Sequence, residues 1–167
     1  MLDNISLSKV LQIPFNLDKA VILPEDSLKS DVDSEAKFKE IMWEYVIEGL
    51  DRISDIDQRK LRGEIFMKIA LERTSAMSAY TTIVDAPLKI LQSLTADNII
   101  DEEPVYKNTY APAHDIYEDW ALTRHIEFNY IKYVANEANY DIFYDSLGST
   151  PAIRRAFRIW VSEKIQI

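Results

Sequence analysis

The chain of 167 residues carries 19 Lys and Arg against 28 Asp and Glu, 47% hydrophobic residues and no cysteine. That length and apolar content suffice for one domain with a core, or for two small helical subdomains that share one. The net charge of -9 repels nucleic acid and anionic membranes, so indiscriminate nucleic-acid binding is not expected. Without cysteine there is no disulfide, no thiolate metal site and no cysteine nucleophile.

Sequence patterns exclude further classes of protein. No stretch reaches a membrane span of about 18 apolar residues, and the first residues lack the apolar core of a secretory signal. We therefore expect a cytoplasmic protein without membrane contact. The glycines Gly49, Gly63 and Gly148 lie far apart, and none precedes Lys-Ser or Lys-Thr. The chain therefore has no P-loop to cradle phosphates, and we expect no enzymatic activity of its own.

The N-terminal part predicts a small helical subdomain over residues 1–25. Two short helices are expected at 5–12 and 14–23, separated at Pro14, which is tolerated in a first helical turn but not in a helix interior. The polar residues 26–33 that follow are the best candidate for a linker to the main body.

Two longer helices are predicted next. Ser34 is a good N-cap for the first, and apolar residues then recur with the spacing of a core-facing stripe. These residues are Phe38, Ile41, Met42, Tyr45 and Val46. The second helix is expected over 57–78, where Leu61, Ile65 and Ile69 recur at intervals of four.

The middle of the chain changes character. Residues 81–84 form a short β-branched run, 86–94 predict a short helix, and 98–113 hold two small apolar pieces around a polar turn. Helix, helix and hairpin in this order are typical of a winged helix, with residues 99–113 as the wing. We expect a mainly α fold in which a winged-helix-like domain with a small β-hairpin wing, residues 34–135, is flanked by helices.

The C-terminal part predicts three more helices. The first is expected over 115–134 and the second over 136–147. Thr150 as N-cap and Pro151 as first helical residue begin the last. Residues 136–167 would start a following helical domain. The tryptophans lie in helical apolar patterns, which favours core packing; they are Trp43, Trp120 and Trp160.

His114 and Asp115 stand where the hairpin turns into a long helix. The first N–H groups of a helix lack intrahelical partners and the helix dipole is positive there, so this point suits an anion such as phosphate. Asp115 also fits an N-cap that pairs with Glu118, and this structural role does not exclude a functional one. No metal site is predicted, because His125 lies about 16 Å from His114 by helical rise.

The positions of the charged residues indicate which partners the chain could bind. Arg154, Arg155 and Arg158 cluster on one side of the last helix. They form either a solvated or intramolecularly paired face, or a docking surface for an acidic partner or another domain. The helix at 86–94 has one lysine, and the hairpin segment 101–108 has three acids against one lysine. Neither suits a phosphate backbone, which argues against direct DNA readout.

Residues 113–121, with the sequence AHDIYEDWA, resemble the MHD-type motif that ends the winged-helix domain of STAND NTPases, the NACHT and NB-ARC group. Ala113 stands where that family commonly has Met or Phe. Residues 11–23 are similar to the family segment in which a proline packs near the adenine, and residues 149–160 resemble the segment that begins a further helical domain. The order of these segments along the chain strengthens the resemblance.

The resemblance implies the regulatory middle of a longer protein, whose P-loop NTPase core lies elsewhere in the same chain. His114 would donate a hydrogen bond to the terminal phosphate of bound ADP, Asp115 would brace the helix start, and Pro14 would contact the adenine. ADP or ATP would bind only with that core, and no cofactor is expected in isolation. The alternatives are a winged-helix DNA-binding transcription regulator, or a nucleotide-independent helical adaptor for protein partners or self-assembly.

Overall fold

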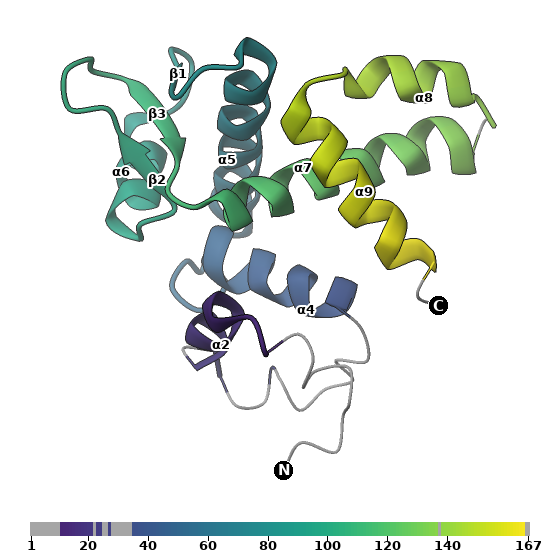
Figure 1. Ribbon diagram of the computed structural model, residues 1–167. Coiled ribbons are helices and arrows are strands. Elements are labelled where there is room, and N and C mark those ends of the chain that lie inside the picture. Colours follow the sequence, from purple (N-terminus) through teal and green to yellow (C-terminus); the bar gives the residue numbers. More distant parts are fainter. Residues whose placement is uncertain (1–10, 22, 25–26, 28–34, 137, 166–167) are drawn as a thin grey trace. The chain divides into compact units, whose positions relative to one another are not determined.

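The computed structural model describes residues 11–21, 23–24, 27, 35–136 and 138–165, which are mainly helical with one small antiparallel sheet (Figure 1). The chain divides into two compact units, Met1–Lys60 and Leu61–Ile167. Among the described residues, no helix is both long and apolar enough to cross a membrane.

Part of the predicted organisation lies outside the described residues. This applies to most of the helix expected at 5–12, to Ser34 and to nearly all of the linker expected at 26–33. The domain boundaries expected from the sequence therefore stay predictions.

The first unit contains two helical segments as expected. α2 (Pro14–Val21) begins at its proline, and α4 (Glu35–Met42) continues into the π-helix η1 (Trp43–Ile47). The predicted apolar stripe is buried except for Tyr45, which is half-buried. Gly49 follows η1 with a φ of 76°, a left-handed conformation that suits glycine and ends the helical segment.

The second unit begins within α5 and builds the sheet. Its first elements are α5 (Ile56–Ala76), β1 (Thr81–Thr82), α6 (Leu88–Ala96), β2 (Ile100–Glu102) and β3 (Thr109–Pro112). β3 is the middle strand and pairs antiparallel with β1 on one side and β2 on the other. The expected hairpin is thus present as β2 and β3, with Asp101 opposite Ala111.

The turn after α6 sets the direction of the hairpin. Asn98 adopts a φ of 54°, its N–H donates to the Thr95 carbonyl, and the Ile99 N–H donates to the Leu94 carbonyl. These two bonds form a Schellman motif, which satisfies the last carbonyls of the helix and reverses the chain. Ile99 and the first residue of β2 are both buried, so the turn delivers the strand directly into the core.

A fully buried arginine fastens α6 to α5. Arg62 donates to the Ser93 hydroxyl and to the Asp97 carboxylate, the latter at 2.5 Å. The position of Arg62 is consistent with the helical spacing of the core residues Ile65 and Ile69 on α5. A charge buried here is tolerated because its donors are paired.

The last helices largely match their predicted positions. They are α7 (Asp115–Tyr130), the π-helix η2 (Ile131–Ala135), α8 (Tyr140–Leu147) and α9 (Pro151–Ile165). The expected start of α8 at residue 136 was wrong. Ala138 has a φ of 53°, which breaks the helix, and the Asn139 side chain then caps α8 by accepting from the Ile142 N–H at 3.2 Å.

The prediction for the start of α9 was half correct. Pro151 is the first helical residue, and the Thr150 carbonyl accepts the first helical hydrogen bond, from Arg154, at 3.0 Å. The Thr150 hydroxyl does not cap the helix, because it is buried without a hydrogen-bond partner in the described part of the chain.

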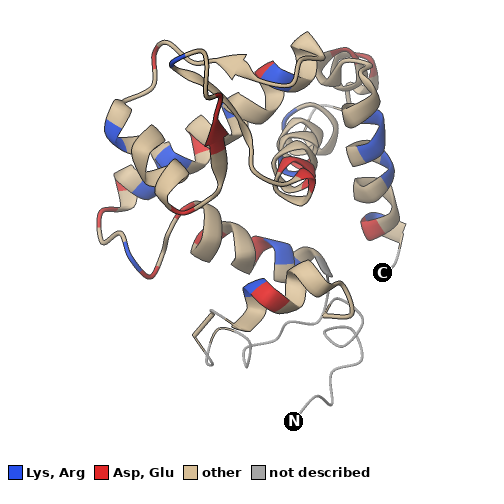
Figure 2. Cartoon of the chain, turned by 60° about the vertical axis from the view of Figure 1, so that its left-hand side comes forward, with Lys and Arg blue, Asp and Glu red and all other residues tan. Residues whose placement is uncertain are grey.

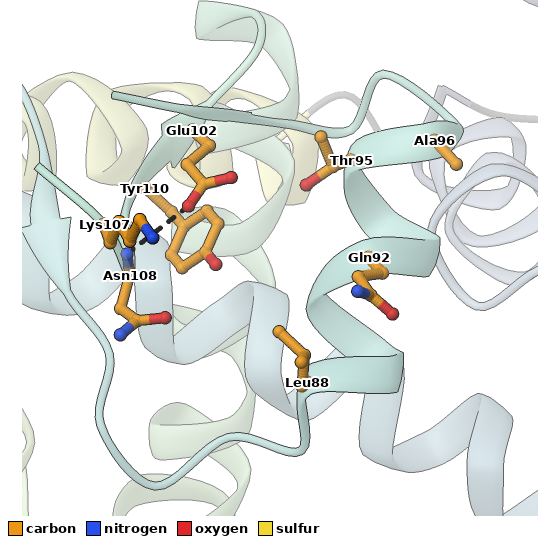
Figure 3. A pocket seen from close by; sticks show the side chains of 8 residues that line it. All are labelled: Leu88, Gln92, Thr95, Ala96, Glu102, Lys107, Asn108 and Tyr110. Atoms are coloured by element: carbon orange, nitrogen blue, oxygen red, sulfur yellow. Dashed lines mark hydrogen bonds between the residues drawn. The ribbon is translucent and has the colours of Figure 1, made fainter. Parts of the chain in front are cut away.

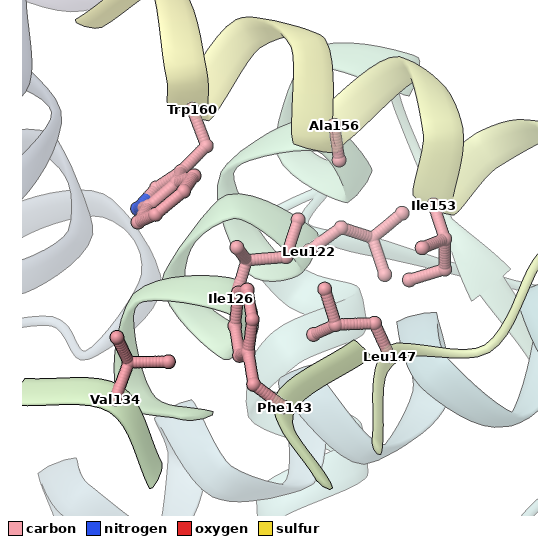
Figure 4. Packing of buried hydrophobic residues seen from close by; sticks show 8 residues of the cluster. All are labelled: Leu122, Ile126, Val134, Phe143, Leu147, Ile153, Ala156 and Trp160. Carbon is pink, nitrogen blue, oxygen red and sulfur yellow. The ribbon is translucent and has the colours of Figure 1, made fainter. Parts of the chain in front are cut away.

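An apolar cluster joins α7, α8 and α9 (Figure 4). Side chains from these three helices and, through Val134, from η2 interdigitate in it; they are Leu122, Ile126, Val134, Phe143, Leu147, Ile153, Ala156 and Trp160. The Trp160 indole N–H donates to Glu127 at 2.6 Å, so its polar atom is satisfied at the edge of the cluster. Trp43 and Trp120 are buried too, which confirms the core role expected for all three tryptophans.

We expect Leu122→Ala to lower the free energy of unfolding by about 2–5 kcal/mol, because it opens a cavity at a fully buried position of this cluster. Ile131→Ala removes an aliphatic side chain that is 49% exposed and should change stability by less than about 0.5 kcal/mol. Urea unfolding of both variants, followed by circular dichroism, measures the difference. Equal effects would contradict the assignment of the cluster as the core of this half.

Candidate functional site

The junction between β3 and α7 is built from the predicted His-Asp pair. Ala113 N–H donates to the Ile99 carbonyl at 2.9 Å, which fixes the end of the hairpin. His114 is extended, with a φ of -141° and a ψ of 143°, and is the N-cap of α7. The expectation of Asp115 as N-cap was therefore wrong by one residue: Asp115 is the first helical residue, because the carbonyl that begins the helix is that of His114.

The functional groups of the junction face outward. His114 and Asp115 are both exposed, and the imidazole packs edge-on against the buried Tyr117 ring with 5.6 Å between centroids. Within the described residues, the backbone N–H groups of Asp115 and Ile116 donate no hydrogen bond, and the His114 side chain does not cap them. An imidazole and two N–H donors at a helix start are the chemistry that binds an anion.

Glu118 lies one turn below and does not complete a capping box. Its side chain is only 4% exposed. The carboxylate accepts from Arg73 Nη1 and, at 3.3 Å, from the Thr74 hydroxyl, both on α5. Its other oxygen accepts from Arg155 Nη2 on α9 at 3.4 Å. The capping-box expectation was wrong because the carboxylate pairs with two arginines instead of reaching back to the start of the helix. This pairing joins α5, α7 and α9 directly beneath the junction.

Asp119 extends the same ionic cluster, which we define as Arg73, Glu118, Asp119 and Arg155. Arg155 Nε donates to the Asp119 carboxylate at 2.8 Å. Burial raises the pKa of Asp119 above its ordinary value, and Arg155 offsets only part of that effect. Burial alone would lower the pKa of Arg155, but the hydrogen bond and charge of Asp119 and the charges of Glu118 and Asp115 raise it.

The three arginines of α9 do not act as one face. Arg155 turns inward to the ionic cluster, whereas Arg154 and Arg158 are exposed. Intramolecular pairing, one of the two interpretations of this group, therefore applies to Arg155. The other interpretation, a docking surface, would involve only Arg154 and Arg158 and stays a prediction.

Sequence reasoning missed Arg73 and misassigned Glu118, although one signal pointed to the glutamate. Glu118 precedes Leu122 and Ile126 at intervals of four, so it lies on the buried stripe of α7, where a carboxylate needs a cationic partner. Nothing in the local sequence marks Arg73 as that partner, because it lies 45 residues away.

The remaining predicted site residues lie elsewhere. Pro14 is exposed at the start of α2 in the first unit, and its contact with an adenine stays a prediction. Among the described residues, no group of three His, Cys, Asp or Glu side chains is placed to hold a metal ion. His125 is half-buried on α7, where burial lowers its pKa below the ordinary 6.5 and a hydrogen bond with the Ser146 backbone opposes the shift.

Comparison with known proteins adds no assignment. No family model matches the chain, and no curated protein matches it significantly. The geometry of the junction and of the ionic cluster must therefore support any function by itself.

We expect Glu118→Gln to lower the free energy of unfolding by about 3 kcal/mol. This is the low end of the range for breaking a buried ion pair, because both arginines stay partly exposed. Glu64→Gln makes the same change on the exposed side of α5 and should stay within about 0.5 kcal/mol. Urea unfolding separates the two, and equal stabilities would show that the ionic cluster does not hold the helices together.

The lowered pKa of His125 predicts that the free energy of unfolding depends on pH. Because its folded-state pKa lies below 6.5, the unfolded chain binds the proton more tightly, and the stability contributed by neutral His125 is lost as the pH falls below 6.5. Urea unfolding at about pH 7.5 and about pH 5.5 spans this range. We expect His125→Gln to lose less stability than the wild type over this interval. An equal loss in both proteins would contradict the prediction.

Proposed function

We propose that this chain is the winged-helix and adjoining helical module of a STAND-type ATPase, which couples the nucleotide state of a P-loop core to a rearrangement between domains. The proposal rests above all on the His114 junction, where an exposed imidazole and open N–H groups stand on a helix fastened to two others. The module itself would not hydrolyse nucleotide.

The order of elements supports a winged helix. α5, β1, α6 and the β2–β3 hairpin give a helix, a strand, a helix and a two-stranded wing, with β3 central in the sheet. The His-Asp pair follows the wing directly, at the same place in the chain as the family motif. We interpret α8 and α9 as the beginning of the further helical region.

The junction fits the phosphate end of ADP. A neutral or protonated imidazole donates to a phosphate oxygen, and helix N–H groups add donors without adding charge. His114 would hold the terminal phosphate, and Asp115, as first residue of α7, would support the positive end of the helix dipole. The nucleotide base and the remaining phosphate contacts would come from the P-loop core.

The ionic cluster supplies a route for coupling. Any displacement of the start of α7 acts on Glu118, which Arg73 ties to α5 and Arg155 ties to α9. Charged hydrogen bonds with buried partners resist separation, so the helices would move as one rigid body. Loss of the contact between His114 and the nucleotide would thus free α5, α7 and α9 to move together, away from the P-loop core.

The local charge disfavours the DNA-binding alternative. The hairpin residues Asp101 and Glu102 are exposed, and Glu103 is half-buried, so the wing presents carboxylates where a DNA reader carries cations (Figure 2). α6 adds only the exposed Lys89.

The test is carried out on the protein expressed from the whole reading frame that contains this chain. We expect His114→Ala to raise the Kd for ADP by about tenfold to a hundredfold, because a hydrogen bond to a charged group is lost. Isothermal titration after removal of co-purified nucleotide measures it. His114→Gln keeps a donor and should weaken ADP binding less.

Two results would overturn the proposal. One is a reading frame without a Gly-Lys-Ser or Gly-Lys-Thr P-loop segment. The other is an ADP affinity of His114→Ala equal to that of Asp141→Ala, which removes an exposed acid from the first turn of α8 and serves as control.

A further inference from the structure

Two rows of unpaired charge lie on the consecutive helices α8 and α9. The row on α8 consists of Asp141 and Asp145, and the row on α9 consists of Arg154 and Arg158. All four residues are exposed, and their side chains form no ion pair or hydrogen bond within the described part of the chain. The members of each row are four residues apart, so they lie on one side of their helix, roughly 6 Å from each other.

An aromatic band separates the two rows. On α8 it consists of Tyr140 and Tyr144, which neighbour the acids and are 56% and 55% exposed. On α9 it consists of Phe157 and Val161, which neighbour the arginines and pack against the apolar cluster. The rings of Tyr144 and Phe157 lie 6.1 Å apart, so the two halves of the band meet between the helices.

Across this surface the side chains follow one order, from the acids to the tyrosines, then to Phe157 and Val161, and last to the arginines. The order follows from a rotation of about 100° per residue, because each half of the band lies between the charges and the core side of its helix. Residues 148–150 join α8 directly to α9 (Figure 1). We call this surface the α8–α9 face; it comprises Tyr140, Asp141, Tyr144, Asp145, Arg154, Phe157, Arg158 and Val161.

The pocket of about 460 Å³ between α6 and the β2–β3 hairpin lacks this separation of charge (Figure 3). One acid, Glu102, and one base, Lys107, line it together with amide and hydroxyl groups, so neither charge prevails there. On the α8–α9 face, by contrast, the acids and the arginines stand on opposite sides of an aromatic band.

A face with this order of side chains is complementary to itself. A twofold axis through the contact between Tyr144 and Phe157 places the acids of each copy opposite the arginines of the other. Both rows repeat after one helical turn, so two oppositely charged pairs can form on each side of the axis. The exposed tyrosines are covered at the same time, and a guanidinium over a tyrosine ring adds a cation–π contact.

Partners with another distribution of charge fit this face less well. A basic partner would pair with the acids but be repelled by the arginines, and an acidic partner would be repelled by the acids. An uncharged apolar partner would take both rows out of water without opposite charges. A second copy of this chain supplies both signs in the required order.

We propose that the chain associates with a second copy of itself as a twofold dimer through the α8–α9 face. Asp141 and Asp145 of each copy pair with Arg154 and Arg158 of the other, and the aromatic bands pack in the centre. The dimer uses neither His114 nor a nucleotide, so it is independent of the proposed ADP switch.

Sedimentation velocity of the complete 167-residue chain tests the dimer directly. We expect a species of twice the chain mass of 19.4 kDa at about 100 µM protein. Raising the NaCl concentration from about 0.05 M to about 0.5 M should weaken dimerisation roughly tenfold, because salt screens the paired rows.

Charge reversal distinguishes pairing between the rows from other modes of association. One variant combines Asp141→Lys with Asp145→Lys, and the other combines Arg154→Glu with Arg158→Glu. Each variant alone should dimerise roughly a hundredfold more weakly, since the twofold axis places like charges opposite each other at both ends. An equal mixture should form a heterodimer within roughly threefold of the wild-type Kd, because the lysines then face the glutamates and the unchanged rows still pair.

Substitutions inside and outside the face form matched pairs. Tyr144→Ala removes a 55% exposed ring from the centre of the band and should weaken dimerisation roughly tenfold. Tyr106→Ala removes a 69% exposed ring from the loop between β2 and β3 and should change the Kd by less than about twofold. Asp85→Lys with Asp101→Lys repeats the charge change at two exposed acids away from the face and should stay within about threefold.

Three results would overturn the proposal. The wild-type chain stays monomeric at about 100 µM, the reversed variants dimerise as tightly as the wild type, or their mixture stays monomeric although both are folded by far-UV circular dichroism. The first result is the one expected if a different protein, or a segment outside these 167 residues, covers the face. If a reversed variant unfolds, Tyr144→Ala and Tyr106→Ala decide, and equal dimerisation of these two overturns the proposal. None of these measurements involves nucleotide, so ADP binding by the His114 variants remains a separate test.

Discussion

The buried carboxylate of Glu118 is the constraint on which the second half of the chain depends. A charge removed from water must be paired, and here Arg73 and Arg155 approach it from two other helices. α7 is therefore held near its start by ionic bonds to both neighbours and further along by the apolar cluster. This double attachment makes the start of α7 a firm platform for the exposed His114.

The His114 junction and the pocket between α6 and the β2–β3 hairpin depend on different features of the fold. The His114 junction needs only a strand that feeds a helix, with the N-cap carbonyl already in use and the imidazole outside. The pocket needs a hairpin and a helix held apart at a fixed distance, which the turn at Asn98 and the buried Arg62 provide. One is a feature of local backbone geometry, and the other arises from packing between elements.

Much of the architecture was predictable because its signals are local. Helical periodicity located α4, α5, α7 and α9, and the two apolar pieces around a polar turn located the hairpin. The errors fell where backbone conformation overrides residue preference. Asp115 and Thr150 are good N-cap residues by type, yet His114 caps α7 and the Thr150 hydroxyl makes no bond in the described part of the chain. Ala138, in a left-handed conformation, delayed α8.

The sequence by itself determined the helices, the hairpin and the His-Asp pair at the head of α7, because periodicity and turn chemistry act over a few residues. Only the tertiary structure decided which arginines neutralise Glu118, since Arg73 and Arg155 lie 45 and 37 residues away in opposite directions. It also decided that Tyr110 meets α6 across a pocket and that Arg155 turns inward while Arg154 faces out. Such pairings depend on how three elements pack together in space, and this packing cannot be deduced from any short segment of the sequence.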